Sequence, residues 1–118
     1  MRSVETSFRP VAVVAAMFMT AGAWAGESVG PRKVLDVGCH NTDGTCYVTL
    51  DGSAFGSTLG CLTGATTEFR FDNGDTTIGR RAYASFLSAL LSGKSVSVYL
   101  DGCTSQGYPQ LVYFHVAN

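Results

Sequence analysis

Apolar residues recur at helical spacing between residues 75 and 93, in the segment DTTIGRRAYASFLSALLSG. The apolar stripe consists of Ile78, Ala82, Phe86, Ala89 and Leu90, with Tyr83 and Leu87 beside it. Spacings of three and four residues place these side chains on one face of a helix. Asp75 or Thr76 can accept hydrogen bonds from the free amides at its start, and Gly93 can adopt the left-handed conformation that ends it. The pattern therefore predicts one amphipathic helix.

Alternation of apolar and polar residues predicts five strands around this helix. In chain order they span residues 33–38, 46–50, 66–71, 95–100 and 110–116. Between the first two strands, Asp43-Gly44 predicts a two-residue hairpin turn, because both central positions of such a turn have positive φ. Pro109 is expected to prevent pairing before the last strand begins.

Two further segments are rich in glycine and small polar residues. Residues 26–32, GESVGPR, predict a loose lead-in to the first strand. Residues 51–65 predict a long loop that holds a short strand around Cys61, and loops of this length often carry binding functions.

Three strands, one helix and two strands predict a mainly β (α+β) fold. The arrangement we favour is a small five-stranded Greek-key barrel of the OB type, with the helix between strands three and four. An α+β sandwich, with the helix on one face of an open sheet, would produce almost the same pattern. Closure removes the sheet edges, which favours the barrel in a chain this small.

The amino-terminal segment has the pattern of a secretory signal peptide. Arg2 and Arg9 precede an apolar run over residues 11–19, and Ala23-Trp24-Ala25 has small residues at the two positions that signal peptidase reads. A membrane anchor would need roughly 20 apolar residues, about twice the length of this run. We therefore expect residues 1–25 to be a removed signal peptide and residues 26–118 to be a single exported domain.

The charge of the exported domain argues against nucleic acid as a partner. The full chain has a formal net charge of −1, and removal of two arginines and one glutamate with the signal peptide leaves −2. A surface that binds phosphates needs clustered cations, and only Arg80-Arg81 comes close to such a cluster. We also expect no membrane association after the signal is cleaved.

All four cysteines follow the predicted cleavage site, so an oxidising compartment and two disulfides are expected. Sequence alone allows three pairings. We favour Cys39 with Cys46, which bracket a short turn, and Cys61 with Cys103, which would tie the long loop to the last hairpin. A zinc site is the alternative, but the chain has no CxxC pair and neither His40 nor His115 has ligand-like spacing to a cysteine.

The sequence favours no enzyme class and implies no cofactor or metal. It has no GxSxG nucleophile elbow, and Ser57 lacks the second flanking glycine. The acidic residues are spread singly over turns, and His40 and His115 read as surface or packing residues. The run DNGD at 72–75 could suggest calcium, but a helix-entry turn explains it and no closing glutamate follows.

A binding role is the remaining class. Small barrels of this type bind through the face of strands two and three and through the loops after strands one and four. The candidate ligand-binding residues in those regions are Asn41, Thr42, Tyr47, Thr49, Arg70, Thr104, Gln106 and Tyr108, and Asp43, Glu68 and Ser105 lie among them. Hydroxyls, amides and aromatic rings suit a sugar. The same residue types also cover the outside of any exported barrel.

A second binding class is a protein-interaction module, such as a periplasmic inhibitor or an assembly component that contacts an envelope protein. In that case the outward-facing Tyr47, Tyr99 and Tyr113 would anchor the interface, because tyrosine buries a large area at low entropic cost.

The carboxyl-terminal half resembles a known family. The helix that ends at Gly93, the strand Lys94-Ser95-Val96-Ser97-Val98 and the Tyr108-Pro109 pair before the last strand resemble the pentameric binding subunits of bacterial A-B toxins, of the subtilase-cytotoxin and typhoid-toxin kind. They also resemble short exported bacterial proteins without an assigned role. The resemblance implies a homo-oligomer, a ring of five barrels that pair edge strands, line a pore with the helix and bind cell-surface glycans.

Overall fold

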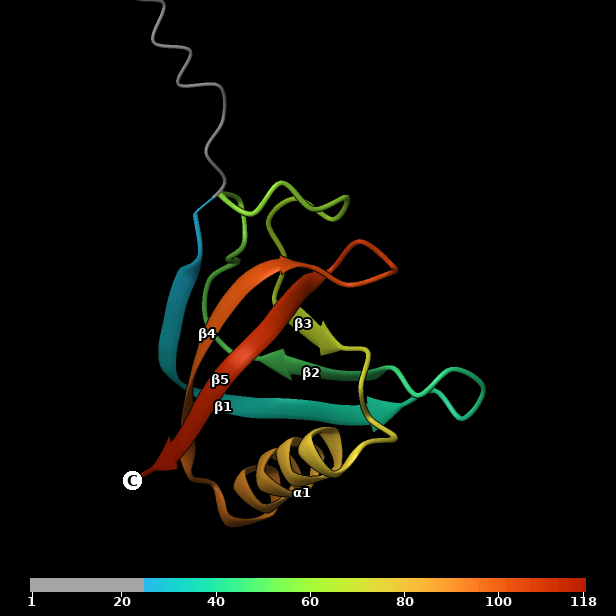
Figure 1. Ribbon diagram of the computed structural model, residues 1–118. Coiled ribbons are helices and arrows are strands. Elements are labelled where there is room, and N and C mark those ends of the chain that lie inside the picture. Colours follow the sequence, from blue (N-terminus) through green and yellow to red (C-terminus); the bar gives the residue numbers. More distant parts are fainter. Residues whose placement is uncertain (1–24) are drawn as a thin grey trace, which may run out of the picture.

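A closed barrel of five strands and one helix forms the part of the chain that the computed structural model describes, residues 25–118 (Figure 1). The predicted signal peptide lies outside the described residues, except for Ala25. In chain order the elements are β1 (Glu27–Cys39), β2 (Cys46–Leu50), β3 (Glu68–Phe71), α1 (Thr77–Ser92), β4 (Ser95–Cys103) and β5 (Pro109–Ala117). The mainly β fold with one helix between strands three and four is therefore confirmed.

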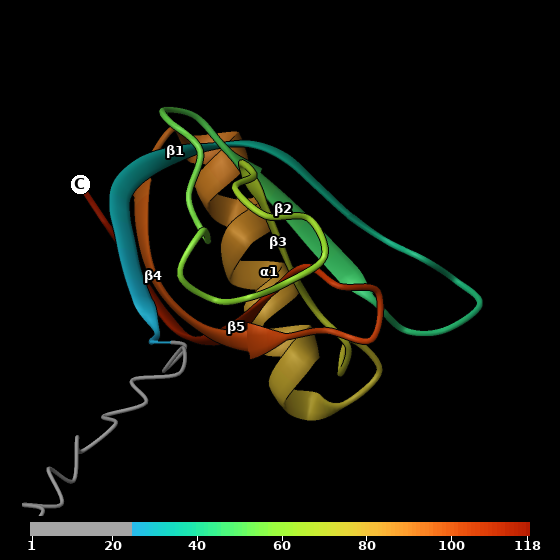
Figure 2. The ribbon, with the colours of Figure 1, turned by 90° about the horizontal axis from the view of Figure 1, so that it is seen from above.

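The barrel closes because β1 is long enough to pair with two different strands. Its first half pairs antiparallel with β4, and its second half pairs antiparallel with β2. The strand changes partner between Lys33, which pairs with Ser95 of β4, and Val34, which pairs with Leu50 of β2, and a register shift interrupts each of the two pairings. Figure 2 shows β1 bending around the barrel. The strand order is β1-β2-β3-β5-β4, and β3 meets β5 in parallel at the single pair Arg70↔Gln110.

The helix has the two ends that the sequence predicts. The Thr76 hydroxyl accepts a hydrogen bond of 3.1 Å from the Gly79 amide, and Gly93 adopts φ 72° at the carboxyl end. The predicted stripe is wrong at Ile78, which is 64% exposed. Gly79 is buried in its place, because the first turn approaches Asn73 and Gly74 so closely that a Cβ atom at position 79 would clash with them.

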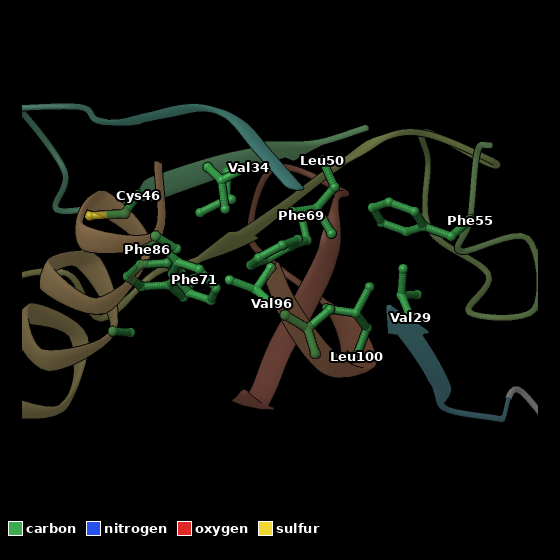
Figure 3. Packing of buried hydrophobic residues seen from close by; sticks show 14 of the residues in the cluster. Val29, Val34, Cys46, Leu50, Phe55, Phe69, Phe71, Phe86, Val96 and Leu100 are labelled. Atoms are coloured by element: carbon green, nitrogen blue, oxygen red, sulfur yellow. The ribbon is translucent and has the colours of Figure 1, made fainter. Parts of the chain in front are cut away.

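Phe86 connects the helix to the inside of the barrel. Its ring lies edge-on to Phe69 with centroids 5.3 Å apart, and 4.8 Å from the ring of Phe114. Figure 3 shows Phe86 and Phe71 at one end of the core and Phe55 with Val29 at the other. The core therefore runs the length of the barrel, with the helix covering one end.

The structure corrects several strand limits. Residues 27–32 belong to β1 and are not a loose lead-in, because they pair with β4. The strand β3 starts at Glu68 and not at residue 66, since Thr66 pairs with Phe55 across the long loop. Pro109 begins β5 opposite Cys103, at the first position of the strand, where a missing amide donor is tolerated.

Two predictions about loops are also wrong. Only Gly44 of the Asp43-Gly44 pair has positive φ, so the connection between β1 and β2 is a six-residue loop, 40–45, and not a two-residue turn. In this loop the Asp43 carboxylate accepts from the Thr45 amide at 3.0 Å, a side-chain contact that replaces the tight turn. No strand forms around Cys61 in the described structure; the loop makes the isolated bridge between Phe55 and Thr66 instead.

Both favoured disulfides are present, Cys39–Cys46 across the end of the β1–β2 pair and Cys61–Cys103 between the long loop and β4. They indicate an oxidising environment. Within residues 25–118, no helix has the length and apolar character needed to cross a membrane.

Glu27 fastens the long loop to the start of β1. Its carboxylate accepts hydrogen bonds from the amides of Gly56 and Thr58, both at 2.9 Å, and from the Thr58 hydroxyl at 2.5 Å. Partial burial by itself raises the pKa of Glu27, but these three hydrogen bonds together outweigh burial and hold the pKa below its ordinary value.

This carboxylate predicts a small loss of stability in acid. The folded state holds the pKa of Glu27 below the unfolded value of about 4.5, so its contribution is complete above that pH and disappears as the pH falls through the folded pKa. We expect the contribution to be under about 1 kcal/mol, because water screens the carboxylate. Urea midpoints of Glu27→Gln and the unmodified chain, measured from pH 6 to pH 3, should converge at low pH. A constant difference over that range would contradict this role.

Candidate functional site

A continuous set of polar and aromatic side chains covers the outer face of β2 and β3 and the two loops next to it. We call it the tyrosine–arginine patch, and it consists of His40, Asp43, Tyr47, Glu68, Arg70, Gln106 and Tyr108. The loops that contribute to it, 40–45 and 104–108, project from the same side of the barrel in both views (Figures 1 and 2).

Strand alternation explains why these residues share a face. Tyr47 pairs with Arg70 and Thr49 with Glu68 across β2 and β3, whereas Val48 and Phe69 between them point into the core. On the other side Tyr47 pairs with Gly38 of β1. The tyrosine hydroxyl end lies so close to Gly38 that a Cβ atom there would clash with the ring.

Arg70 lies at the centre of the patch. Its guanidinium carbon lies 3.6 Å from the ring centroid of Tyr108 and 5.8 Å from that of Tyr47. Its Nε donates to the Glu68 carboxylate at 2.6 Å, and its Nη1 donates to the side-chain oxygen of Gln106. Only 13% of the side chain is exposed, because Arg70 lies between the sheet and the 104–108 loop and contacts both.

Gln106 extends these contacts from one loop to the other. While its oxygen accepts from Arg70, its Nε2 donates to the Asp43 carboxylate at 3.1 Å. Asp43 also lies 3.5 Å from His40 Nδ1. The Thr45 amide first, and His40 in addition, hold the pKa of Asp43 below its ordinary value despite partial desolvation, so the carboxylate is charged at neutral pH.

His40 belongs to the patch, although the sequence suggested only a surface or packing residue. Its ring centroid lies 5.7 Å from that of Tyr47. His40 is the first residue after β1 and follows Gly38, which pairs with Tyr47, by two positions, so it continues the alternation of the strand on the side of Tyr47. The sequence contains this spacing, but the pairing of Gly38 with Tyr47 is known only from the structure.

The other predicted site residues divide into accessible and inaccessible groups. Asn41 and Thr42 are exposed in the 40–45 loop, and Thr49 is half-buried on the face that carries Tyr47. Thr104 is buried, and its hydroxyl accepts from the Tyr108 amide at 3.3 Å. Thr104 therefore closes the 104–108 loop instead of meeting a ligand.

Asp72 connects the two loops of the patch through its carboxylate. Its two carboxylate oxygens accept from the Thr45 hydroxyl at 3.0 Å and from the Ser105 amide at 2.8 Å, so one side chain fixes both loops. It also lines a shallow cavity of about 260 Å³ where β3 and β5 separate, together with Phe71, Asn73, Gln110 and Leu111. Asp72 is the first residue of DNGD, and both of its carboxylate oxygens are used in these hydrogen bonds within the protein.

The patch brings aromatic, cationic and anionic side chains together on one face of the barrel. It contains the rings of Tyr47 and Tyr108, the guanidinium of Arg70, the imidazole of His40, and the carboxylates of Asp43 and Glu68. Within residues 25–118, no group of three or more His, Cys, Asp or Glu side chains is placed to hold a metal ion. A comparison of the chain with protein-family models finds no match, and neither does a comparison with curated proteins.

Proposed function

We propose that this chain is an exported, non-enzymatic binding domain built on an OB-type barrel, and that it binds a glycan through the tyrosine–arginine patch. The observation that carries the proposal is the convergence of β2, β3 and the 104–108 loop on Arg70, whose guanidinium carbon lies 3.6 Å from the Tyr108 ring centroid. Gln106 joins the 40–45 loop to this cluster through Asp43. The strand order β1-β2-β3-β5-β4, with the helix after β3, supports the OB type. The two disulfides support export.

Sugars suit this surface for two physical reasons. An aromatic ring covers the apolar face of a pyranose, and nearby amides, hydroxyls and charged groups meet its hydroxyls. The accessible polar groups at the rim are Asn41 and Thr42, and the ring of Tyr47 is half-exposed. Arg70 is largely covered, so its proposed role is to position the rings of Tyr47 and Tyr108. Membership of the toxin binding-subunit family and assembly into a ring of five are predictions of the resemblance alone, and glycan binding at the patch does not require either.

A glycan array probed with the purified protein tests the proposal. We expect a defined set of glycans to bind, and Tyr47→Ala to weaken that binding at least tenfold, because the ring supplies the stacking surface. The matched control is Tyr113→Ala, which removes an exposed tyrosine from β5, outside the patch, and should bind as before.

Two outcomes would contradict glycan binding at the patch. One is an array without any signal from correctly folded protein. The other is an equal loss of binding in Tyr47→Ala and Tyr113→Ala, which would place the ligand elsewhere.

The second candidate function is protein interaction. The three tyrosines proposed as anchors do not form one surface, because Tyr47 belongs to the patch whereas Tyr99 and Tyr113 stack on β4 and β5 with centroids 5.9 Å apart. What favours the candidate is a group of exposed apolar residues on α1 and β5, among them Ile78, Val112 and Tyr113.

A further inference from the structure

One edge of β5 has no backbone partner over most of its length. On one side, β5 pairs with β4 from the Ser95↔Ala117 pair to the Cys103↔Pro109 pair. On the other side it meets β3 at the single pair Arg70↔Gln110. From residue 111 to residue 117, that second edge therefore pairs with no strand of the described chain. The free amides and carbonyls of such an edge can bind another extended strand.

A groove accompanies this edge. It has a volume of about 410 Å³, lies between α1 and β5, and is lined by Ile78, Arg81, Ala82, Val112, Tyr113 and Phe114. Figure 1 shows α1 below the strands, on the side toward which β5 runs. Ile78 and Val112 are 64% and 54% exposed, although β-branched apolar residues of this kind normally bury much of their surface. A strand added to β5 would cover both.

Nothing in the sequence of β5 from residue 111 to residue 117 protects this edge. Natural monomers usually place lysine, proline or a carboxylate on an exposed edge strand, which prevents pairing with other chains. Residues 111–117, LVYFHVA, contain none of these. The segment is therefore suited to pairing, and the groove beside it determines which partner fits.

The charge of the groove points to an acidic partner. Arg81 is the charged residue in the lining. The ion pairs found within residues 25–118 join His40 with Asp43 and Arg70 with Glu68, so neither neutralises Arg81. A second copy of this chain would bring no carboxylate on its β5 and would add the Arg81 of its own α1. Self-pairing therefore fits the groove less well than a strand with an acidic side chain.

We propose that the β5 edge and this groove bind an extended segment of a partner protein. The segment adds a strand to β5, places apolar side chains at alternate positions over Ile78 and Val112, and places a carboxylate next to Arg81. This site does not involve the tyrosine–arginine patch, so the inference does not depend on glycan binding.

Selection from a displayed library of random nine-residue peptides tests the proposal with the purified protein as target. We expect enriched peptides to alternate apolar and polar residues and to carry an aspartate or glutamate at a constant position. Addition of an enriched peptide should shift the backbone amide resonances of residues 111–117. A peptide with proline at its central position should bind at least tenfold more weakly, because proline lacks the donor that strand pairing requires.

Charge reversal at Arg81 tests whether the peptide binds in the groove. Arg81→Glu should weaken an enriched acidic peptide at least tenfold and should bind the matching lysine peptide better than the unmodified protein does. The matched control is Arg80→Glu, which makes the same charge change on the neighbouring exposed residue of α1, outside the groove lining. It should bind the acidic peptide within about twofold of the unmodified protein, since exposed charges outside the contact are screened.

Three results would overturn the proposal: no enrichment over an unselected library, equal effects of Arg80→Glu and Arg81→Glu, or a dimer or ring of this chain in solution whose interface buries β5. The last would assign the edge to a second copy of this chain.

Discussion

Phe86→Ala should be the most destabilising single substitution in this protein, with a loss of about 3–5 kcal/mol in the free energy of unfolding. The Phe86 side chain is fully buried and is the main contact between α1 and the interior of the barrel, where it meets Phe69, Phe71 and Phe114. Domains of this size have a total stability of about 5–15 kcal/mol. Urea denaturation followed by far-UV circular dichroism measures the loss.

Ile78→Ala is the matched control, because it truncates an apolar side chain of the same helix. Ile78 is 64% exposed, so we expect a change within about 0.5 kcal/mol. If Phe86→Ala does not fold, Phe86→Leu keeps an apolar side chain and should lose about 1.5 kcal/mol. Similar losses for Phe86→Ala and Ile78→Ala would mean that the helix packs through a different face.

The helix was the most predictable element, and the reason is local. Its hydrophobic period, its cap at Thr76 and its stop at Gly93 lie within one short segment, and each depends on near neighbours. The error at Ile78 arises from a contact outside that segment. The approach of Asn73 and Gly74 turns Gly79 inward, and no periodicity within the helix reports that contact.

The limits of a strand were predictable where they follow the alternation of apolar and polar residues, as in β2. They were less predictable where they depend on pairing with a distant strand. The first residues of β1 looked like a loop because Gly30 and Pro31 interrupt any pattern. They form a strand because β4 pairs with them. Thr66 is the opposite case. It continues the alternation of β3 and was predicted to belong to that strand, but in the structure it pairs with Phe55 of the long loop.

The candidate site was predictable as a region but not as a set of contacts. Strand alternation and the topology of the barrel placed Tyr47, Arg70, Gln106 and Tyr108 together. The sequence could not show that Arg70 would be covered, because its partners lie 36 and 38 positions away in the 104–108 loop. Nor could it show that Thr104 is used to close that loop.

Removal of the Cys61–Cys103 disulfide should have the second large effect. Its cysteines are 42 positions apart, whereas those of the Cys39–Cys46 disulfide are 7 apart. In the chain-entropy description, a cross-link destabilises the unfolded state by an amount that grows with the closed loop, about 4 kcal/mol for the longer loop and about 2.5 kcal/mol for the shorter. Urea denaturation of Cys61→Ala/Cys103→Ala should show the larger loss, and a loss under about 1 kcal/mol would contradict this account.

The slope of the urea transition shows in which state the disulfide acts. Without it, the long loop stays attached in the folded state, because Glu27 still accepts from Gly56 and Thr58, and Arg32 still donates to the Asp51 carbonyl at 3.0 Å. The native amide spectrum away from the two substitutions should therefore stay the same. The unfolded chain becomes more expanded, so the dependence on urea should steepen. An unchanged slope, together with shifted resonances over residues 51–66, would instead place the stabilisation in the folded loop.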